Sequence, residues 1–332
     1  MSNSTSGNTL LAFARNADGT LTQVASYATG GLGSGSGLEN QEALTLSVDR
    51  KYLYVVNPGS NDVSAFQITD QGLAQTARVS TGGRLPVSVT EYNGLVYVLN
   101  RGSQANDPNG DNISGLRLGS DGSLSPITGS TAQLSAANTN AAQVAFSPGG
   151  NFLVVTEHGG GPIDTYVVNA DGSAGGHQVQ PSAGAGPFGF AFRNASQLFV
   201  SEAGRGTVSS YSLNAQGILT VISGAVSTQQ ATACWLVITP DLQEAYVSNT
   251  VSGTVSEFAI ASDGSLSLVS SIAATTTGGP LDMAISSDGA YLYVLTTSGN
   301  IDVFQIAATT GALAPAPAVT GLPGGSNGLV GF

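Results

Sequence analysis

The chain has 332 residues, of which 41% are hydrophobic, and it carries a formal net charge of −12 with only nine Lys and Arg residues. So few cationic side chains exclude a surface that tracks nucleic-acid phosphates or binds an anionic membrane, and no apolar run reaches the length of a membrane span. Only 9% of the residues are charged while 45 are glycine, which favours turn-rich β structure over surface helices.

The first predicted elements are two strands joined by an Asp-Gly turn, within residues 8–27 (NTLLAFARNADGTLTQVASY). Asp-Gly between two such runs indicates a hairpin, because glycine tolerates the positive φ that tight hairpin turns require. From about residue 41 onward a unit of four short runs repeats. Each run has the length and the β-branched or aromatic enrichment of a strand, and no stretch keeps a helical period.

The second run of each unit defines the repeat most clearly. Its six copies are KYLYVVN, GLVYVLN, NFLVVTE, SQLFVSE, QEAYVSN and AYLYVLT, which end at Asn57, Asn100, Glu157, Glu202, Asn249 and Thr296. These end positions recur every 43 to 47 residues, with one longer interval of 57. Four antiparallel strands per period of this length are typical of a β-propeller blade. The predicted blades span about 41–80, 86–130, 141–182, 187–228, 233–275 and 280–320.

The two ends of the chain are expected to form a seventh, closing blade. Residues 8–28 supply its third and fourth strands, and residues 326–332, which end in GLVGF, supply its first strand. No second strand is evident, although MSNST at the N-terminus is a candidate, so the closing blade is expected to be one strand short. The prediction is an all-β, seven-bladed propeller of four-stranded antiparallel blades, a single domain over 1–332 that leaves few exposed sheet edges.

Propeller topology determines which loops meet at each end of the central channel. The loops from second to third strands, and from each fourth strand to the next first strand, share one face; the hairpin turns share the other. The first kind is long and rich in glycine, as in residues 29–43, 157–164 and 183–190, whereas the hairpin turns are short. Because loops on a rigid scaffold usually carry function, the site is predicted at the face with the long loops.

Residues with chemical potential are concentrated in these loops. The predicted catalytic residues, Glu157, His158, Glu202 and Arg205, follow the second strands of two neighbouring blades. An acid, an imidazole and a guanidinium together suit the activation of water at an ester and the stabilisation of an oxyanion. The predicted substrate-binding residues are Asn100, Arg101, Gln143, Phe188, Trp235 and Asp282.

Each of these residues also has a structural alternative. The glutamates are equally suited to accept hydrogen bonds from backbone amides, the arginines to form ion pairs, and the two aromatic residues to plug the channel. With one cysteine, Cys234, and two histidines, we expect no disulfide, no metal site and no cofactor. The oligomeric state is left open.

The composition also bears on location. Scarce Lys with abundant Ser, Thr, Asn and Gly resembles secreted bacterial proteins. The N-terminal MSNSTSGN lacks the basic and apolar regions of a signal peptide, so the expected extracellular or periplasmic location requires a leader outside this sequence. A cytoplasmic location is the alternative.

Several segments resemble the seven-bladed lactonase-like propellers, a family that includes bacterial 6-phosphogluconolactonases and fungal carboxymuconate-cyclising enzymes. The resemblance covers nearly the whole chain. It is carried by SPGGNFLVVTEHG and SSDGAYLYVLT, and VNPGSNDVSAF, PFGFAF and ATACW are similar to a bacterial, often exported subgroup. The resemblance implies the propeller fold and a small lactone, ester or sugar-like ligand.

The resemblance also has two departures. Enzymatic members carry a histidine on a first strand, where this chain has Gln143, and a Ser-Asn-Arg pattern, where this chain reads Ser248-Asn249-Thr250. Glu157 and Glu202 match the acidic residue that follows second strands in the family. Two functions therefore remain: a lactone or ester hydrolase with its ligand at the channel mouth, or a non-catalytic extracellular propeller that binds a glycan or a protein or assembles with itself.

Overall fold

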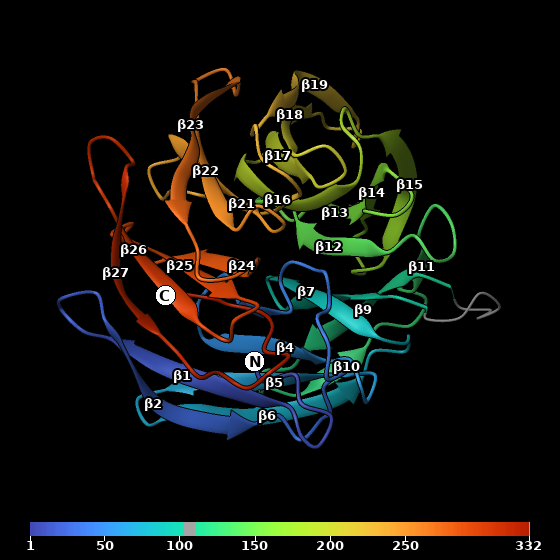
Figure 1. Ribbon diagram of the computed structural model, residues 1–332. Helices are drawn as coiled ribbons and strands as arrows, with labels where there is room; N and C mark the ends of the chain where they lie inside the picture. Colours follow the sequence, from blue (N-terminus) through green and yellow to red (C-terminus); the bar gives the residue numbers. More distant parts are fainter. Residues whose placement is uncertain (103–109, 332) are drawn as a thin grey trace.

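The computed structural model describes residues 1–102 and 110–331, whose strands form a ring of sheets around an axis (Figure 1). Six of the sheets are complete blades, in which consecutive strands pair antiparallel, and a smaller sheet pairs only β1 with β2. The prediction of an all-β propeller with four-stranded antiparallel blades is confirmed. The repeat predicted over 86–130 includes residues 103–109, which lie outside the described residues.

The strands follow the predicted repeat along the chain. The small sheet holds β1 (Thr9–Arg15) and β2 (Leu21–Ala28). The first three complete blades hold β3 (Leu44–Leu46), β4 (Tyr52–Asn57), β5 (Asp62–Thr69) and β6 (Gly72–Ser80); β7 (Pro86–Tyr92), β8 (Leu95–Asn100), β9 (Asn112–Leu118) and β10 (Leu124–Pro126), with β11 (Ala132–Gln133) also on β9; and β12 (Ala141–Phe146), β13 (Phe152–Glu157), β14 (Pro162–Val168) and β15 (Ala174–Pro181). The other three hold β16 (Pro187–Asn194), β17 (Gln197–Glu202), β18 (Thr207–Leu213) and β19 (Leu219–Ser227); β20 (Ala233–Ile238), β21 (Glu244–Asn249), β22 (Thr254–Ile260) and β23 (Leu266–Thr275); and β24 (Pro280–Ile285), β25 (Tyr291–Thr296), β26 (Ile301–Ile306) and β27 (Leu313–Val319).

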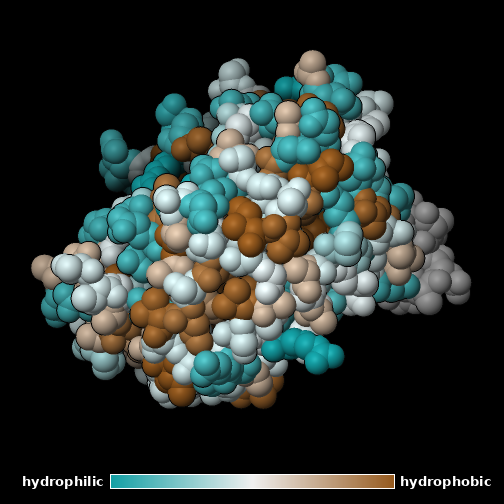
Figure 2. Space-filling model, turned by 90° about the horizontal axis from the view of Figure 1, so that it is seen from above, coloured by the Kyte–Doolittle hydropathy of each residue, from teal (hydrophilic) through white to brown (hydrophobic). Residues whose placement is uncertain are grey.

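Burial explains why the second strands carry the clearest sequence signal. The second strand of each complete blade is buried along nearly its whole length, because neighbouring blades cover both of its faces. The fourth strands, such as β19 and β23, mix exposed and half-buried positions at the outer rim. Figure 2 shows one side of this rim, where apolar and weakly polar residues make up much of the surface, as expected for a chain with few charges.

A polar side chain ends several second strands and links them to the third strand. The Asn57 amide donates to Asp62 Oδ1 at 2.7 Å and to Ser64 Oγ at 2.8 Å. Two further asparagines make the equivalent pairs of bonds: Asn100 to Asn112 and Ser114, and Asn249 to Thr254 and Ser256. We call this arrangement the strand-end cluster, and it gives the last residue of a second strand a structural role in the blade.

The two ends of the chain meet in the closing blade. The Met1 amine donates to the Asn327 carbonyl at 2.9 Å, the Asn327 amide donates back to the Met1 carbonyl at 3.0 Å, and the Ser2 amide donates to the Thr9 carbonyl at 2.8 Å. The first strand predicted over 326–332 is wrong for its described part, because residues 326–331 form no regular strand and the Leu329 amide donates to Asp282 instead. Phe332 lies outside the described residues.

Candidate functional site

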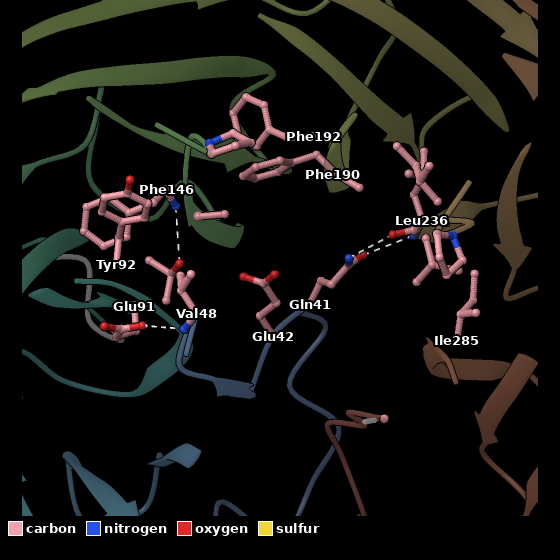
Figure 3. A pocket seen from close by; sticks show the side chains of 18 of the residues that line it. Gln41, Glu42, Val48, Glu91, Tyr92, Phe146, Phe190, Phe192, Leu236 and Ile285 are labelled. Carbon is pink, nitrogen blue, oxygen red and sulfur yellow. Dashed lines mark hydrogen bonds between the residues drawn. The ribbon is translucent and has the colours of Figure 1, made fainter. Parts of the chain in front are cut away.

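Residues 38–43, which lie between β2 and β3, cross the channel near the face with the long loops. Leu38 is 3% exposed and Asn40 is fully buried. Backbone hydrogen bonds tie this channel segment to three blades: Gln41 N to the Ala142 carbonyl, Val89 N to the Glu42 carbonyl, and Val56 N to the Ala43 carbonyl, all between 2.9 and 3.0 Å. The Gln41 side chain reaches a fourth blade, where its amide pairs with the Leu236 backbone (Figure 3).

Arg101 holds the channel segment in place. Its guanidinium donates to the Leu38 carbonyl at 2.6 Å, to the Glu39 carbonyl, and to the Ala141 carbonyl at 2.7 Å. Burial lowers the pKa of Arg101 to about 10, and the nearby Glu39 carboxylate opposes that shift. The Arg101 side chain, which was predicted from the sequence to bind substrate, therefore donates three hydrogen bonds to the backbone of the protein itself.

Aromatic side chains close the same end of the channel. The Trp235 indole donates to the Asn40 carbonyl at 2.8 Å, and its ring lies 5.1 Å from that of Phe188 in an edge-to-face contact. The His158 ring also meets Phe188 edge to face, at 5.5 Å. Of the predicted site residues, Arg101 and Trp235 hydrogen-bond to the channel segment and Phe188 packs against Trp235, so the channel is plugged at this face.

Glu202 points into its own blade. Its carboxylate accepts hydrogen bonds from Thr207 Oγ1 at 2.5 Å, Ser209 Oγ at 2.6 Å and the Gly184 amide at 2.8 Å, and it is fully buried. Thr207 and Ser209 stand in β18 where Asp62 and Ser64 stand in β5. Glu202 is therefore a member of the strand-end cluster, and the structure does not bring it to the channel.

Glu157 is also fully buried and directed away from the channel. It accepts hydrogen bonds from the amide of Ser135, at 2.8 Å, and from the hydroxyl of the same residue. Burial, together with the neighbouring Asp164, raises the pKa of Glu157 to about 8. Asp164 in turn lies 3.0 Å from His177 Nε2, so this carboxyl pair belongs to a polar group between β13, β14 and β15.

The remaining predicted residues are scattered. Arg205 is exposed on its loop, and Asn100 belongs to a strand-end cluster. Gln143 is fully buried and its amide exchanges two hydrogen bonds with the Phe190 backbone, at 2.7 and 3.1 Å. Asp282 accepts the amides of Met283 and Leu329, and burial raises its pKa to about 7.

A cavity of about 640 Å³ occupies the other part of the channel and opens between the hairpin turns. Figure 3 shows side chains that line it. Its mouth is formed by residues of the turns between first and second strands, including Val48, Arg50, Pro148 and Pro240. Its walls include Tyr92, Phe146, Phe190 and Phe192 from the first strands. The cavity therefore opens at the end of the channel opposite to the one that loop length favoured.

Glu42 is the titratable group best placed in this cavity. Its side chain points into the space (Figure 3), and Oε2 has no hydrogen-bond partner among the described residues. Burial, with a smaller contribution from the charge of Asp282, raises the pKa of Glu42 to about 8, against the opposing effect of the Gln143 amide. Glu42 also has a φ of 62°, in the left-handed region that a non-glycine residue occupies only when its surroundings hold it there.

Glu91 also lines the cavity but is held differently. Its carboxylate accepts the Val48 amide at 2.8 Å and the Gly94 amide at 2.6 Å. Neither Glu42 nor Glu91 was predicted, because Glu42 lies in a loop that occurs once in the chain and Glu91 lies near the end of a first strand, β7, beside a short hairpin turn. Glu91 could have been noticed in the sequence, because it lies in TEYNG at a place where other blades have turns such as SPGG and SSDG, which lack a glutamate.

Other chemistries find less support in the described residues. Over 1–102 and 110–331, no three His, Cys, Asp or Glu side chains are arranged to hold a metal ion. Cys234 is buried, which raises the pKa of its thiol to about 11. The same ranges contain no helix of the length and apolar character that crossing a membrane requires.

The comparisons with known proteins agree with the fold. The family model described as "Lactonase, 7-bladed beta-propeller" matches residues 6–107, 110–235 and 143–327. No curated protein matches the chain.

Among solved structures, a candidate 6-phosphogluconolactonase from Bacteroides uniformis superposes with a TM-score of 0.76 at 22% identity over 92% of this chain and 90% of that one. The periplasmic gluconolactonase of Pseudomonas aeruginosa superposes with a TM-score of 0.76 at 19% identity over 95% and 93%. A Lactobacillus plantarum protein superposes with a TM-score of 0.73 at 21% identity over 92% of this chain and 89% of that one. At these identities the structural likeness shows the fold alone. On the family match, the chain belongs to the seven-bladed lactonase propellers.

Proposed function

We propose that the protein binds a small neutral lactone or ester in the cavity at the hairpin face and hydrolyses it, with Glu42 as the general base. The observation that carries this proposal is the Glu42 carboxyl, which lines the cavity, has a buried oxygen with no partner in the described part of the chain, and has a pKa raised to about 8. A general base is most effective when its pKa lies near the working pH. A carboxyl with an ordinary pKa would be a much weaker base for water.

The chemistry needs only water and the lactone. The Glu42 carboxylate takes a proton from a water molecule as the water oxygen attacks the lactone carbonyl carbon, which gives a tetrahedral intermediate. The ring C–O bond then breaks, and the proton passes from Glu42 to the departing ring oxygen. The product is an open-chain hydroxy acid, and Glu42 returns to its starting state.

The walls of the cavity favour a neutral, ring-shaped substrate. Phe146, Phe190 and Phe192 supply apolar surface for the face of a sugar-like ring. Among the described lining residues, Arg50 at the mouth is the single cation, against the carboxyls of Glu42 and Glu91. When Glu42 is ionised to act as the base, a phosphorylated lactone would meet net negative charge here, so we infer that unphosphorylated lactones are preferred.

A binding function without turnover is the second candidate. It is favoured by Gln143, because the amide that stands in place of the family's histidine does not titrate and is already paired with the Phe190 backbone. The assignment of catalysis to Glu157, Glu202, His158 and Arg205 stays a prediction, and mutation can separate it from the Glu42 proposal. The carboxylates of Glu157 and Glu202 already accept hydrogen bonds, which favours Glu42 as the first residue to test.

The expected location outside the cytoplasm also stays a proposal. It is supported by the composition and by the description of the Pseudomonas aeruginosa protein as periplasmic, which is a statement about that relative at 19% identity. Fractionation of the native host would test it.

The test is a lactone-hydrolysis assay with glucono-lactone and simple aliphatic lactones on matched variants. Glu42→Gln is expected to lower kcat at least about 100-fold, the usual contribution of a general base. Glu39→Gln is the control, because Glu39 lies on the same loop in the same backbone region but is exposed.

Two outcomes would change the assignment. If Glu42→Gln keeps full activity while folded Glu157→Gln or Glu202→Gln loses it, the catalytic carboxyl lies in the blades. If no lactone is turned over above the buffer rate but a lactone raises the melting temperature of the wild type, the protein is a binder.

A further inference from the structure

Within residues 1–102 and 110–331, the closing blade has an unpaired inner edge that the other blades lack. In each complete blade a six-residue second strand lies between the first and third strands. In the described part of the closing blade the third strand, β1, pairs with β2 alone. On its inner side, the described backbone contact is the single bond from the Ser2 amide to the Thr9 carbonyl.

A cavity of about 680 Å³ runs along this edge. It is lined by six consecutive residues of β1, from Leu10 to Arg15, so it extends over the length of a second strand. The neighbouring blades form its sides, with Leu44, Leu46 and Leu53 from one and Tyr293, Leu295 and Ile301 from the other. It therefore occupies the position at which every complete blade holds its second strand.

The backbone of β1 is prepared for a further strand. In an antiparallel pair, every second residue directs its amide and carbonyl away from the partner strand. Alternate residues between Leu10 and Arg15 thus face the cavity with backbone groups that β2 does not use. The bonds of Ser2 and Met1 already begin the missing ladder, and an added strand would continue it.

The charge of the side chains that line the cavity limits which kinds of segment can occupy it. Among its described lining side chains, Arg15 is the single charged group, and its guanidinium forms an ion pair with Asp288 at 2.6 Å. A charged segment would be desolvated here without a partner, whereas an uncharged one would bury apolar surface. The complementary occupant is an uncharged strand with the character of the chain's own second strands.

We propose that this cavity binds an extended, uncharged peptide segment of a partner polypeptide, about six residues long, which pairs antiparallel with β1 and completes the closing blade. This is strand addition, in which backbone hydrogen bonds supply affinity and the alternate side chains supply specificity. The segment's side chains pack between the two neighbouring blades, as those of the other second strands do.

The probe is a labelled synthetic peptide with the uncharged sequence YLYVVN, copied from residues 52–57 and capped at both ends. Saturable binding by fluorescence anisotropy is expected, together with at least tenfold slower hydrogen exchange of backbone amides in residues 10–15. A peptide with proline at its second and fourth positions is expected to bind at least tenfold more weakly, because proline cannot donate to a ladder.

Variants of the protein locate the binding. Ala12→Trp, which fills the cavity beside β1, is expected to weaken the peptide at least tenfold, and Glu42→Gln, in the other cavity, to leave it unchanged. If Ala12→Trp does not fold, the exchange measurement on the wild type still decides. Three results would each overturn the proposal. The first is equal binding of the proline peptide, and the second is no protection of residues 10–15. The third is a thermal shift with the fatty acid decanoate, a probe for a lipid-binding cavity, but none with the peptide. None of these outcomes depends on lactone hydrolysis.

Discussion

The end of the central channel with the long loops is closed, whereas the end with the short hairpin turns is open. The long, glycine-rich loops meet at the end that is plugged, where residues 38–43, Trp235 and Phe188 fill the channel. The short hairpin turns surround the end that is open. A long loop has enough chain to enter the axis and hydrogen-bond several blades, whereas a short hairpin cannot reach it. A long loop in a propeller therefore indicates that enough polypeptide is present to close the channel, as well as a place where a site can form.

Glu202 and Glu42 differ in how many partners their carboxyl groups have. Glu202 is surrounded by hydroxyl and amide donors supplied by its own blade. Glu42 has an oxygen without a hydrogen-bond partner among the described residues, and its pKa is raised. Buried carboxylates with several donors are stable in the charged form and suited to structure, whereas a carboxyl without them exchanges protons near neutral pH. This contrast is the reason that we assign the base to Glu42, which lines the cavity that opens at the hairpin face.

Removal of Arg101 should show the largest effect on stability. Arg101→Ala leaves the carbonyls of Leu38, Glu39 and Ala141 without their charged donor, so we expect a loss of about 4 kcal/mol in the free energy of unfolding, measured in urea. Arg205→Ala, at an exposed position on the same face, is the control and should stay within about 0.5 kcal/mol. Equal effects of the two variants would mean that Arg101 does not hold the channel segment.

Stability should also depend on pH through Glu42. Its folded pKa of about 8 lies above the ordinary value of 4.5, so the folded state favours the protonated form. The resulting stabilisation is complete below about pH 4.5 and is lost as the pH rises through about 8. The melting temperature of the wild type should fall between pH 5 and pH 9, by the equivalent of about 4 kcal/mol from this group.

Glu42→Gln removes the titrating group and should flatten that fall in melting temperature. Asp282, with a pKa raised to about 7, contributes in the same direction and should account for part of what remains. Glu39→Gln should reproduce the wild-type curve. A Glu42→Gln curve as steep as that of the wild type would mean that Glu42 titrates normally.

The smallest expected effect comes from the indole hydrogen bond. Trp235→Phe keeps the contact with Phe188 but loses the bond to the Asn40 carbonyl, so we expect a loss of about 1 kcal/mol with lactone kcat and KM nearly unchanged. A large rise in KM with unchanged stability would instead indicate that the ligand binds at the plugged end.

The fold was predictable because its signal repeats. The second strands are buried on both faces, so runs such as KYLYVVN and AYLYVLT are apolar over their full length and recur at one period. The Asp-Gly turn likewise predicted the pairing of β1 with β2. The strand expected near the C-terminus did not form, because the Leu329 amide donates to Asp282, a contact that no local pattern indicates.

The candidate site was predictable only in part. Glu157 and Glu202 stand where other blades have Asn57, Asn100 and Asn249, and that equivalence was the available sign of a structural role. Glu42 lies in a segment with no counterpart in other repeats, so no comparison within the chain could single it out. Its pKa depends on the shape of the cavity and on the partners it lacks, and neither is a property of local sequence.

The pH dependence of kcat/KM for glucono-lactone tests the central claim most directly. A base in the open cavity with a pKa near 8 predicts a rate that rises with pH to a plateau above about 8, in the wild type and in Glu39→Gln, and a loss of that rising limb in folded Glu42→Gln. An unchanged limb in Glu42→Gln, or one that disappears only in Glu157→Gln, would contradict the assignment of catalysis to the hairpin end of the channel.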